Sequence, residues 1–286
     1  MGLNDFISIY EGKELAQKYH KYRTTIPPHV AEQVVGRLRQ CKGGSAEKTF
    51  DRMLDVGCGS GQAIKSFSPY FKHILGVDIS AEQLEVAEDV NEFDNVTYKK
   101  MLDNNLPVGD NSIDLVTCVD AAHWFDIEYF TKECQRVLKP DGCAVIYVRL
   151  EASMILLPEK KVSNQKDLDY QFDQLNRQFL KDINGHERNN LILERYVPLF
   201  KKIPTKAKSF LDGMQFTVDW TLRNYREFWT TKGEYYALMK NNRPDVDPLD
   251  IFIERLKRFL GAERKNEDDI KTRITYDLPA IVITKS

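Results

Sequence analysis

The stretch Leu54-Asp55-Val56-Gly57-Cys58-Gly59-Ser60-Gly61 decides how this chain of 286 residues folds. It begins as a short apolar strand, places three glycines at alternate positions, and leads into a helical pattern over residues 62–71. Glycines at such a turn permit a tight bend and let a ligand approach the backbone closely. In an open parallel sheet, ligands bind beyond the carboxyl ends of the strands. The stretch therefore predicts a ligand-binding turn in an α/β sheet.

The spacing of the glycines narrows the class of ligand. A dinucleotide-binding turn has the pattern G-x-G-x-x-G and a phosphate-binding loop has G-x-x-x-x-G-K-[ST], whereas this chain has G-x-G-x-G. Asp55 would repel a pyrophosphate but can accept hydrogen bonds from a ligand ammonium or from bound water. Asp78 ends the next strand about 20 residues further on, where an acidic side chain holds both hydroxyls of a ribose. Together these features favour a nucleoside ligand over a mere tight turn.

Strand and helix patterns alternate around this turn. Strand patterns occupy residues 53–56, 74–77, 96–101, 113–119 and 143–148, and helical patterns occupy 62–71, 81–90 and 127–138. A helix N-cap is predicted at Ser80, and a turn at residues 139–142. Buried strands that alternate with helices imply a parallel sheet with helices on both faces. We expect this α/β core to span residues 46–150.

The flanking regions differ from the core. Residues 1–45 predict two N-terminal helices, broken at Pro27-Pro28, that form a lid. Residues 151–212 are polar with scattered aromatic side chains, and we expect a helical cap that binds substrate. Residues 213–286 predict a strand at 215–220, helices at 222–239 and 249–260, and a strand region at 274–284. We expect this last region to complete the sheet.

Composition argues against several classes of protein. The net charge of -2 and the pI of about 6.3 disfavour a chain that grips nucleic acid through bulk positive charge. The clearest apolar run, residues 143–148, is far shorter than the ~20 residues of a membrane span. Five cysteines without a CxxC pair predict neither a disulfide framework nor a metal site. We expect a cytoplasmic protein that binds no metal, no membrane and no nucleic acid.

Several stretches resemble the class I S-adenosylmethionine-dependent methyltransferases of the type 11-like group. The matching stretches are residues 54–61, 76–80, 106–116 and 137–142. The run Ala122-His123-Trp124-Phe125-Asp126, with Tyr19-x-x-Tyr22-Arg23, is similar to the eukaryotic trans-aconitate methyltransferase-like group. The resemblance implies a Rossmann-like, seven-stranded, mostly parallel sheet whose last strand is antiparallel. It also implies S-adenosylmethionine as cofactor and S-adenosylhomocysteine as product.

The resemblance also implies which residues contact the cofactor. The glycines would pass under its methionine and ribose, Asp55 would face the amino-acid end, and Asp78 the ribose hydroxyls. Ile79 and the loop after the third strand would bracket the adenine; in that loop Leu102 stands where many relatives carry an acid. The implied cofactor contacts are Tyr22, Asp55, Gly57, Gly59, Gly61, Asp78, Ile79, Asp103, Asn104 and Asp120.

The candidate catalytic residues are Arg23, Asp120 and His123, and the candidate substrate contacts are Arg23, His123 and Trp124. Methyl transfer to a carboxylate needs alignment and a cation, but no base. Arg23 can supply a bidentate clamp, although it could instead pair with a surface acid. His123 is either a base or substrate donor, or a structural residue that bonds a backbone carbonyl. Trp124 suits a pocket wall and a core equally.

Four functional hypotheses follow. The first is methylation of a small molecule by S-adenosylmethionine. A carboxylic acid, converted to its methyl ester, is one candidate acceptor, and the sequence leaves open whether the nucleophile is oxygen, nitrogen or sulfur. The second is a non-catalytic protein that binds S-adenosylmethionine and a partner. A nicotinamide-dependent oxidoreductase is disfavoured by the glycine spacing. A nucleic-acid methyltransferase is disfavoured because Asp120-Ala121-Ala122-His123 replaces the amino-methylating signature and no basic extension is present. A monomer and a homodimer both remain open.

Overall fold

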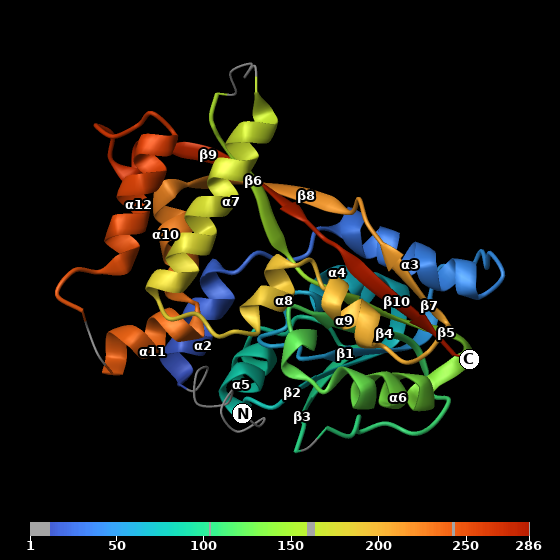
Figure 1. Cartoon of the computed structure of the whole chain (residues 1–286). Helices are drawn as coiled ribbons and strands as arrows, with labels where there is room; N and C mark the ends of the chain where they lie inside the picture. Colours follow the sequence, from blue (N-terminus) through green and yellow to red (C-terminus); the bar gives the residue numbers. More distant parts are fainter. Residues whose placement is uncertain (1–11, 103, 159–163, 242–243, 286) are drawn as a thin grey trace.

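The computed structural model describes residues 12–102, 104–158, 164–241 and 244–285. Its main sheet has seven strands in the order β3-β2-β1-β4-β5-β10-β7 (Figure 1). These strands are β1 (Phe50–Val56), β2 (Phe71–Asp78), β3 (Val96–Lys100), β4 (Ile113–Val119), β5 (Leu138–Tyr147), β7 (Lys208–Leu211) and β10 (Ala280–Thr284). The first five are mutually parallel, and β10 is antiparallel to both of its neighbours. The predicted seven-stranded, mostly parallel fold is confirmed.

Helices cover both faces of this sheet. Successive residues of a strand point to opposite faces, so apolar side chains on each face are buried beneath a layer of helices. In β1, Met53 belongs to the core beneath α3 (Pro28–Cys41) and α4 (Ile64–Phe67). Its neighbour Leu54 belongs to the core beneath α6 (Ile127–Val137) and α9 (Val197–Lys202). Both side chains are almost fully buried. The apolar run of the sequence therefore becomes a central strand that is buried on two faces.

The helix α5 (Ala81–Asp89) begins where it was predicted to begin. The side-chain oxygen of Ser80 accepts a hydrogen bond from the backbone amide of Gln83 at 3.2 Å, which makes Ser80 the N-cap. The preceding helical pattern is shorter than predicted: α4 is followed by a 3₁₀ turn at Ser68–Tyr70, and β2 starts at Phe71. Pro69 lies in that turn, where it cannot continue an α-helix.

The predicted turn at residues 139–142 is wrong, because these residues lie inside β5. The register of β4 and β5 shifts there: Ile113 pairs with Leu138, but Leu115 pairs with Cys143. A β-carbon added at Gly142 would lie 2.8 Å from the carbonyl oxygen of Asp114. At Gly142 the backbone of β5 therefore lies too close to the backbone of β4 to leave room for a side chain.

A second, antiparallel sheet lies beside the first, with the order β6-β9-β8. Its strands are β6 (Leu150–Leu156), β8 (Gln215–Thr221) and β9 (Lys271–Asp277). The remaining helices are α2 (Lys13–Tyr22), α7 (Gln165–Asp182), α8 (Asn189–Leu193), α10 (Leu222–Thr230), α11 (Gly233–Asn241) and α12 (Pro248–Phe259). Figure 1 shows α7, α10 and α12 grouped at the upper left, with the main sheet and α6 at the lower right.

The structure corrects four expectations about residues 151–286. The region 151–212 is not wholly helical, since it contains most of β6 and all of β7, and β7 rather than a later segment forms the edge of the main sheet. The strand predicted at 215–220 joins the second sheet. The helix predicted at 222–239 is two helices, α10 and α11. The strand region 274–284 is divided at Leu278-Pro279 between two sheets, because proline cannot donate to a strand ladder.

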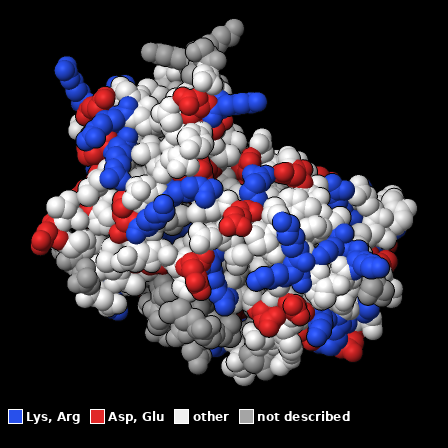
Figure 2. Space-filling model, viewed as in Figure 1, with Lys and Arg blue, Asp and Glu red and all other residues white. Residues whose placement is uncertain are grey.

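The surface carries both signs of charge, interspersed over the face seen in Figure 2. All five cysteines are free thiols. Among the described residues, no helix is both long and apolar enough to cross a membrane, and no group of three or more His, Cys, Asp or Glu side chains is placed to hold a metal ion.

Candidate active site

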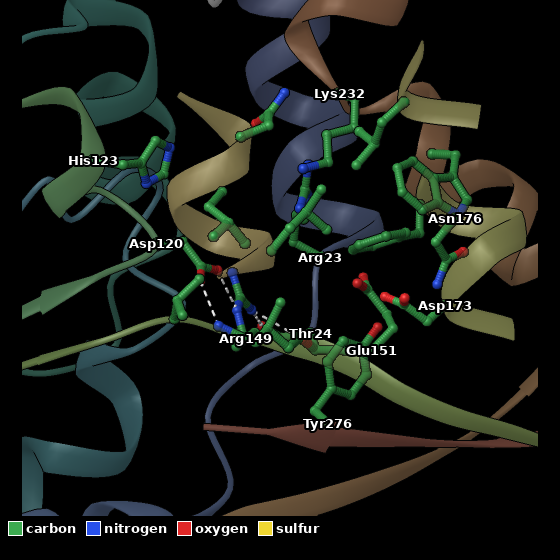
Figure 3. A pocket seen from close by; sticks show the side chains of 18 of the residues that line it. Arg23, Thr24, Asp120, His123, Arg149, Glu151, Asp173, Asn176, Lys232 and Tyr276 are labelled. Carbon is green, nitrogen blue, oxygen red and sulfur yellow. Dashed lines mark hydrogen bonds and ion pairs between the residues drawn. The ribbon is translucent and has the colours of Figure 1, made fainter. Parts of the chain in front are cut away.

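Two cavities adjoin where β1, β2 and β4 end. The glycine-turn cavity is lined by Tyr19, Gly57, Gly59, Asp78, Ile79, Ser80, Gln83, Met101, Val119, Asp120, Ala121, Trp124 and Phe125. The second, which we call the charged cavity, includes Arg23, Asp120, His123, Arg149, Glu151 and Lys232 in its lining (Figure 3). Tyr19, Asp120 and Trp124 line both cavities. These three residues therefore form the boundary across which two ligands could meet.

The glycine turn has a geometry that only glycine adopts readily. Gly57, Gly59 and Gly61 have φ angles of 70°, 54° and 82°. A β-carbon at Gly57 would lie 2.4 Å from the β-carbon of Ala121, and one at Gly61 would lie 2.6 Å from the hydroxyl oxygen of Tyr98. Gly57 and Gly59 line the cavity, whereas Gly61 does not. Two of the three predicted glycine contacts thus face the ligand space.

Asp78 lies at the end of β2 with both carboxylate oxygens toward the turn. One oxygen accepts the backbone N–H of Gly59 at 2.9 Å, and the other accepts that of Ser80 at 2.9 Å. Burial raises the pKa of Asp78, although these backbone hydrogen bonds act against the rise. A carboxylate oxygen has two lone pairs, so each keeps capacity for a ligand hydroxyl. Beside it, Ile79 and Met101 give the cavity an apolar wall.

Asp55 lies beneath the turn, not in either cavity lining. It is 1% exposed, and its Oδ1 atom accepts the Thr117 hydroxyl at 2.7 Å. Its Oδ2 atom has no hydrogen-bond partner among the described residues. Burial raises the pKa of this carboxyl to about 7, despite the hydrogen bond from Thr117. A buried acceptor without a partner fits a site that a ligand or a water completes.

Asp120 joins the two cavities and is paired with Arg149. Its Oδ1 atom accepts the Arg149 backbone N–H at 2.7 Å, and its Oδ2 atom accepts Arg149 Nε at 2.5 Å. Burial acts to raise the pKa of Asp120, but the charge and hydrogen bonds of Arg149 outweigh it, so the pKa is lowered. Arg149 also donates to the Thr24 hydroxyl at 2.9 Å. Asp120 is therefore a fixed anion at the boundary.

Arg23 extends from the end of α2 into the charged cavity. Its Nε atom donates to the Thr231 hydroxyl at 2.7 Å. Its guanidinium carbon lies 4.8 Å from the ring centre of Tyr19 and 4.5 Å from that of Phe228. Among the described residues it forms no ion pair, so the structure does not place it against a surface acid. The guanidinium is thus held by aromatic rings with its terminal nitrogens available.

His123 lies buried in the lining of the charged cavity. Its Nδ1 atom is 2.7 Å from the Tyr196 hydroxyl oxygen, and its backbone carbonyl accepts Arg188 Nη1 at 2.9 Å. Burial lowers its pKa to about 3, so the imidazole is neutral near pH 7. The ring centre of the adjacent Trp124 lies 4.9 Å from that of His123. Both residues therefore shape the cavity wall.

Two of the candidate contacts lie elsewhere, and a third is not among the described residues. Tyr22 lines a separate groove, where its ring centre is 4.9 Å from Lys21 Nζ. Asn104 is exposed and lines neither cavity. Asp103 lies outside the described residues. The aromatic contact that α2 supplies is Tyr19, four residues before Arg23 and so on the same helix face.

Sequence reasoning also missed Arg149, Glu151 and Lys232. Arg149 and Glu151 lie where the chain passes from the main sheet into the second sheet, and Lys232 lies between α10 and α11. No motif marks these positions. The only available signal was their charge close to the end of a predicted strand or helix.

The fold is that of the class I S-adenosylmethionine-dependent methyltransferases, and the chain is an S-adenosylmethionine-dependent methyltransferase. The model of the methyltransferase domain matches residues 54–146. The candidate S-adenosylmethionine-dependent methyltransferase CRG1 of Saccharomyces cerevisiae is 28% identical over 240 residues, which cover 76% of this chain and 81% of the yeast protein. The uncharacterized methyltransferase YcgJ of Bacillus subtilis is 40% identical over 95 residues, or 32% of this chain and 38% of that protein.

A solved structure shows the same fold. A candidate type II methyltransferase from Anaeromyxobacter dehalogenans gives a TM-score of 0.65 at 21% identity, over 92% of this chain and 98% of that one. The predicted enzyme class and cofactor are confirmed, in preference to the nicotinamide-dependent alternative. The narrower resemblance to the trans-aconitate methyltransferase-like group stays a prediction.

Proposed function

We propose that this enzyme methylates a carboxylate oxygen of a small acid held in the charged cavity. The observation that carries the proposal is Arg23, a guanidinium in the cavity lining with no ion-pair partner among the described residues. It is stacked on Tyr19, a boundary residue, so a carboxylate bound to it would lie close to the cofactor side. Guanidinium groups match carboxylates through two parallel hydrogen bonds.

The glycine-turn cavity suits S-adenosylmethionine. Asp78 has lone pairs left for the ribose hydroxyls. Ile79 and Met101 offer an apolar wall for the adenine, and Gly57, which has no side chain, lets the ligand approach the backbone. The unpartnered Oδ2 atom of Asp55 fits an interaction with the methionine ammonium through a bridging water, since Asp55 itself does not line the cavity. We therefore assign the ribose to Asp78 and an indirect, positioning role to Asp55.

The proposed chemistry needs no general base. S-adenosylmethionine, when bound, supplies a methyl group whose bond to sulfur breaks as its bond to the carboxylate oxygen forms, leaving a methyl ester and S-adenosylhomocysteine. No proton leaves the substrate, and His123, with a pKa of about 3, is a weak base. We assign His123 a hydrogen-bonding role in the cavity wall. Arg23 aligns the carboxylate, while Tyr19 and Trp124 exclude water at the boundary.

The cofactor assignment is tested by calorimetric titration with S-adenosylhomocysteine. Asp78→Ala should weaken binding more than tenfold, because losing hydrogen bonds to a charged group costs about 1.4 kcal/mol or more. Glu128→Gln, an exposed carboxylate on α6, is the matched control and should bind like wild type. Equal affinity of wild type and Asp78→Ala would refute the role of Asp78.

The acid assignment is tested by following labelled methyl groups from S-adenosylmethionine into a panel of small acids, amines and thiols. We expect base-labile methyl esters from acids. Transfer to amines or thiols alone would overturn the carboxylate proposal. Binding of S-adenosylhomocysteine without transfer to any compound of the panel would likewise overturn the carboxylate proposal.

A further inference from the structure

The charged cavity contains one acid that is left without a partner. Glu151, on β6, lines the cavity, and its carboxylate has no hydrogen bond or ion pair with another described residue. The other two acids of the lining are paired: Asp120 with Arg149 at 2.5 Å, and Asp173 with Arg177 at 2.7 Å. Glu151 is therefore an acceptor that the fold leaves open toward the cavity.

Two cations of the same lining are open as well. Lys232 approaches the Trp229 ring at 5.7 Å but forms no ion pair among the described residues, and neither does Arg23. In Figure 3, Glu151 and Asp173 extend into the cavity from one side and Lys232 from the opposite side. The cavity thus presents two unpaired positive charges and one unpaired negative charge at separate places.

Burial shifts the pKa values of Glu151 and Lys232, neither of which forms an ion pair with another described residue. Burial raises the pKa of Glu151, although Lys232 and Arg23 act against the rise. Burial, with the charge of Arg23, lowers the pKa of Lys232. Charged groups that lack solvent shift in these directions, and a ligand of opposite charge reverses the shift. Ligand groups of both signs would stabilise the charged forms.

Resting on the proposed function, we propose that the methyl acceptor is a dicarboxylic acid that also carries an amino or hydroxyl group. Arg23 and Lys232 hold its two carboxylates, and Glu151 accepts a hydrogen bond from the amino or hydroxyl group. Glu151 is then the residue that selects this acid over the same acid without the donor. A polar site built to accept a hydrogen bond discriminates strongly against a ligand that leaves it unpaired.

Three acids that differ at one carbon test the proposal: succinate, malate and aspartate. We expect kcat/KM for malate or aspartate to exceed that for succinate by at least about tenfold. Glu151→Gln keeps the side-chain shape but loses the charge, so it should reduce the aspartate-to-succinate ratio about tenfold or more. The malate-to-succinate ratio should fall less, because the amide oxygen of glutamine still accepts a hydrogen bond from a hydroxyl. The affinity for S-adenosylhomocysteine and the thermal midpoint should stay unchanged, which shows that the variant is folded.

The controls separate this inference from the proposed function. Glu128→Gln should leave the ratio as in wild type. Equal kcat/KM for the three acids, or an unchanged aspartate-to-succinate ratio in Glu151→Gln, would overturn the role of Glu151 while methylation of acids still stands. No methyl ester from any of the acids by a protein that binds S-adenosylhomocysteine would overturn the acid proposal and this inference together.

Discussion

The protonation of His123 follows from its burial. The side chain is 4% exposed, and its pKa of about 3 lies well below the value of 6.5 for an unperturbed imidazole. Between these values the unfolded chain binds more protons than the folded chain, so stability falls as the pH drops below about 6.5. We expect His123 to account for a loss of about 2 kcal/mol between pH 7.5 and pH 5.

Urea unfolding at these two pH values checks this prediction. The loss measured for wild type should exceed that for His123→Gln by about 2 kcal/mol, because glutamine does not titrate. His73→Gln, on the exposed side of β2, is the control and should show the wild-type loss. Identical losses in wild type and His123→Gln would mean that the imidazole is protonated in the folded protein without penalty.

At the scale of single residues, only part of the candidate site could be predicted from the sequence. Gly57 and Asp78 could be predicted because a nucleoside site imposes a fixed spacing on one turn and the next strand end. Arg23 and His123 could be predicted only through the family resemblance. Glu151 could not, because its role depends on the charges of Arg23 and Lys232, which lie far away in sequence and line the same cavity only in the folded chain.

At the scale of elements, the close approach of two loops sets the shape of the glycine turn. The turn after β1 meets the segment after β4, where a β-carbon at Gly57 would lie 2.4 Å from that of Ala121. We predict that Gly57→Ala weakens S-adenosylhomocysteine binding tenfold or more, since the turn must shift. The double variant Gly57→Ala/Ala121→Gly removes the contact but keeps the φ of 70°, which costs about 1 to 2 kcal/mol.

Calorimetry and urea unfolding distinguish these two effects. Gly43→Ala is a matched control, because its φ is 68° and an added β-carbon would meet nothing within 4 Å. We expect the double variant to recover most of the affinity and to match Gly43→Ala in stability loss. If Gly57→Ala destabilised no more than Gly43→Ala, the contact with Ala121 would not constrain the turn.

Elements differ in how far the sequence predicts them. The second half of β1, Met53–Val56, was predictable because both faces of the sheet are covered there, so these residues are buried and mostly apolar. The strand β6 was not, because its sequence Leu-Glu-Ala-Ser-Met-Ile-Leu is partly exposed and places Glu151 in a cavity. The division between β9 and β10 was also hidden, because one continuous strand pattern supplies two sheets.

At the scale of the whole molecule, each sheet supports a different cavity. The main sheet ends beneath the glycine-turn cavity, and Phe125 of its lining is stacked on Phe130 of α6 with ring centres 4.9 Å apart. The charged cavity instead depends on the helices beside the second sheet. There Phe179 of α7 stacks on Phe252 at 4.5 Å and meets the edge of Trp229, a lining residue, at 5.0 Å. Binding of the two ligands should therefore respond to different core residues.

A pair of core variants tests this division. Phe179→Leu and Phe130→Leu each remove a buried ring, and each should cost about 1 to 3 kcal/mol of unfolding free energy. Phe179→Leu should raise the KM for the acid several-fold with little change in affinity for S-adenosylhomocysteine, because Trp229 and the nearby Lys232 lose their support. Phe130→Leu should do the reverse through Phe125. If both variants changed both affinities equally, the two cavities would behave as one site supported by one core.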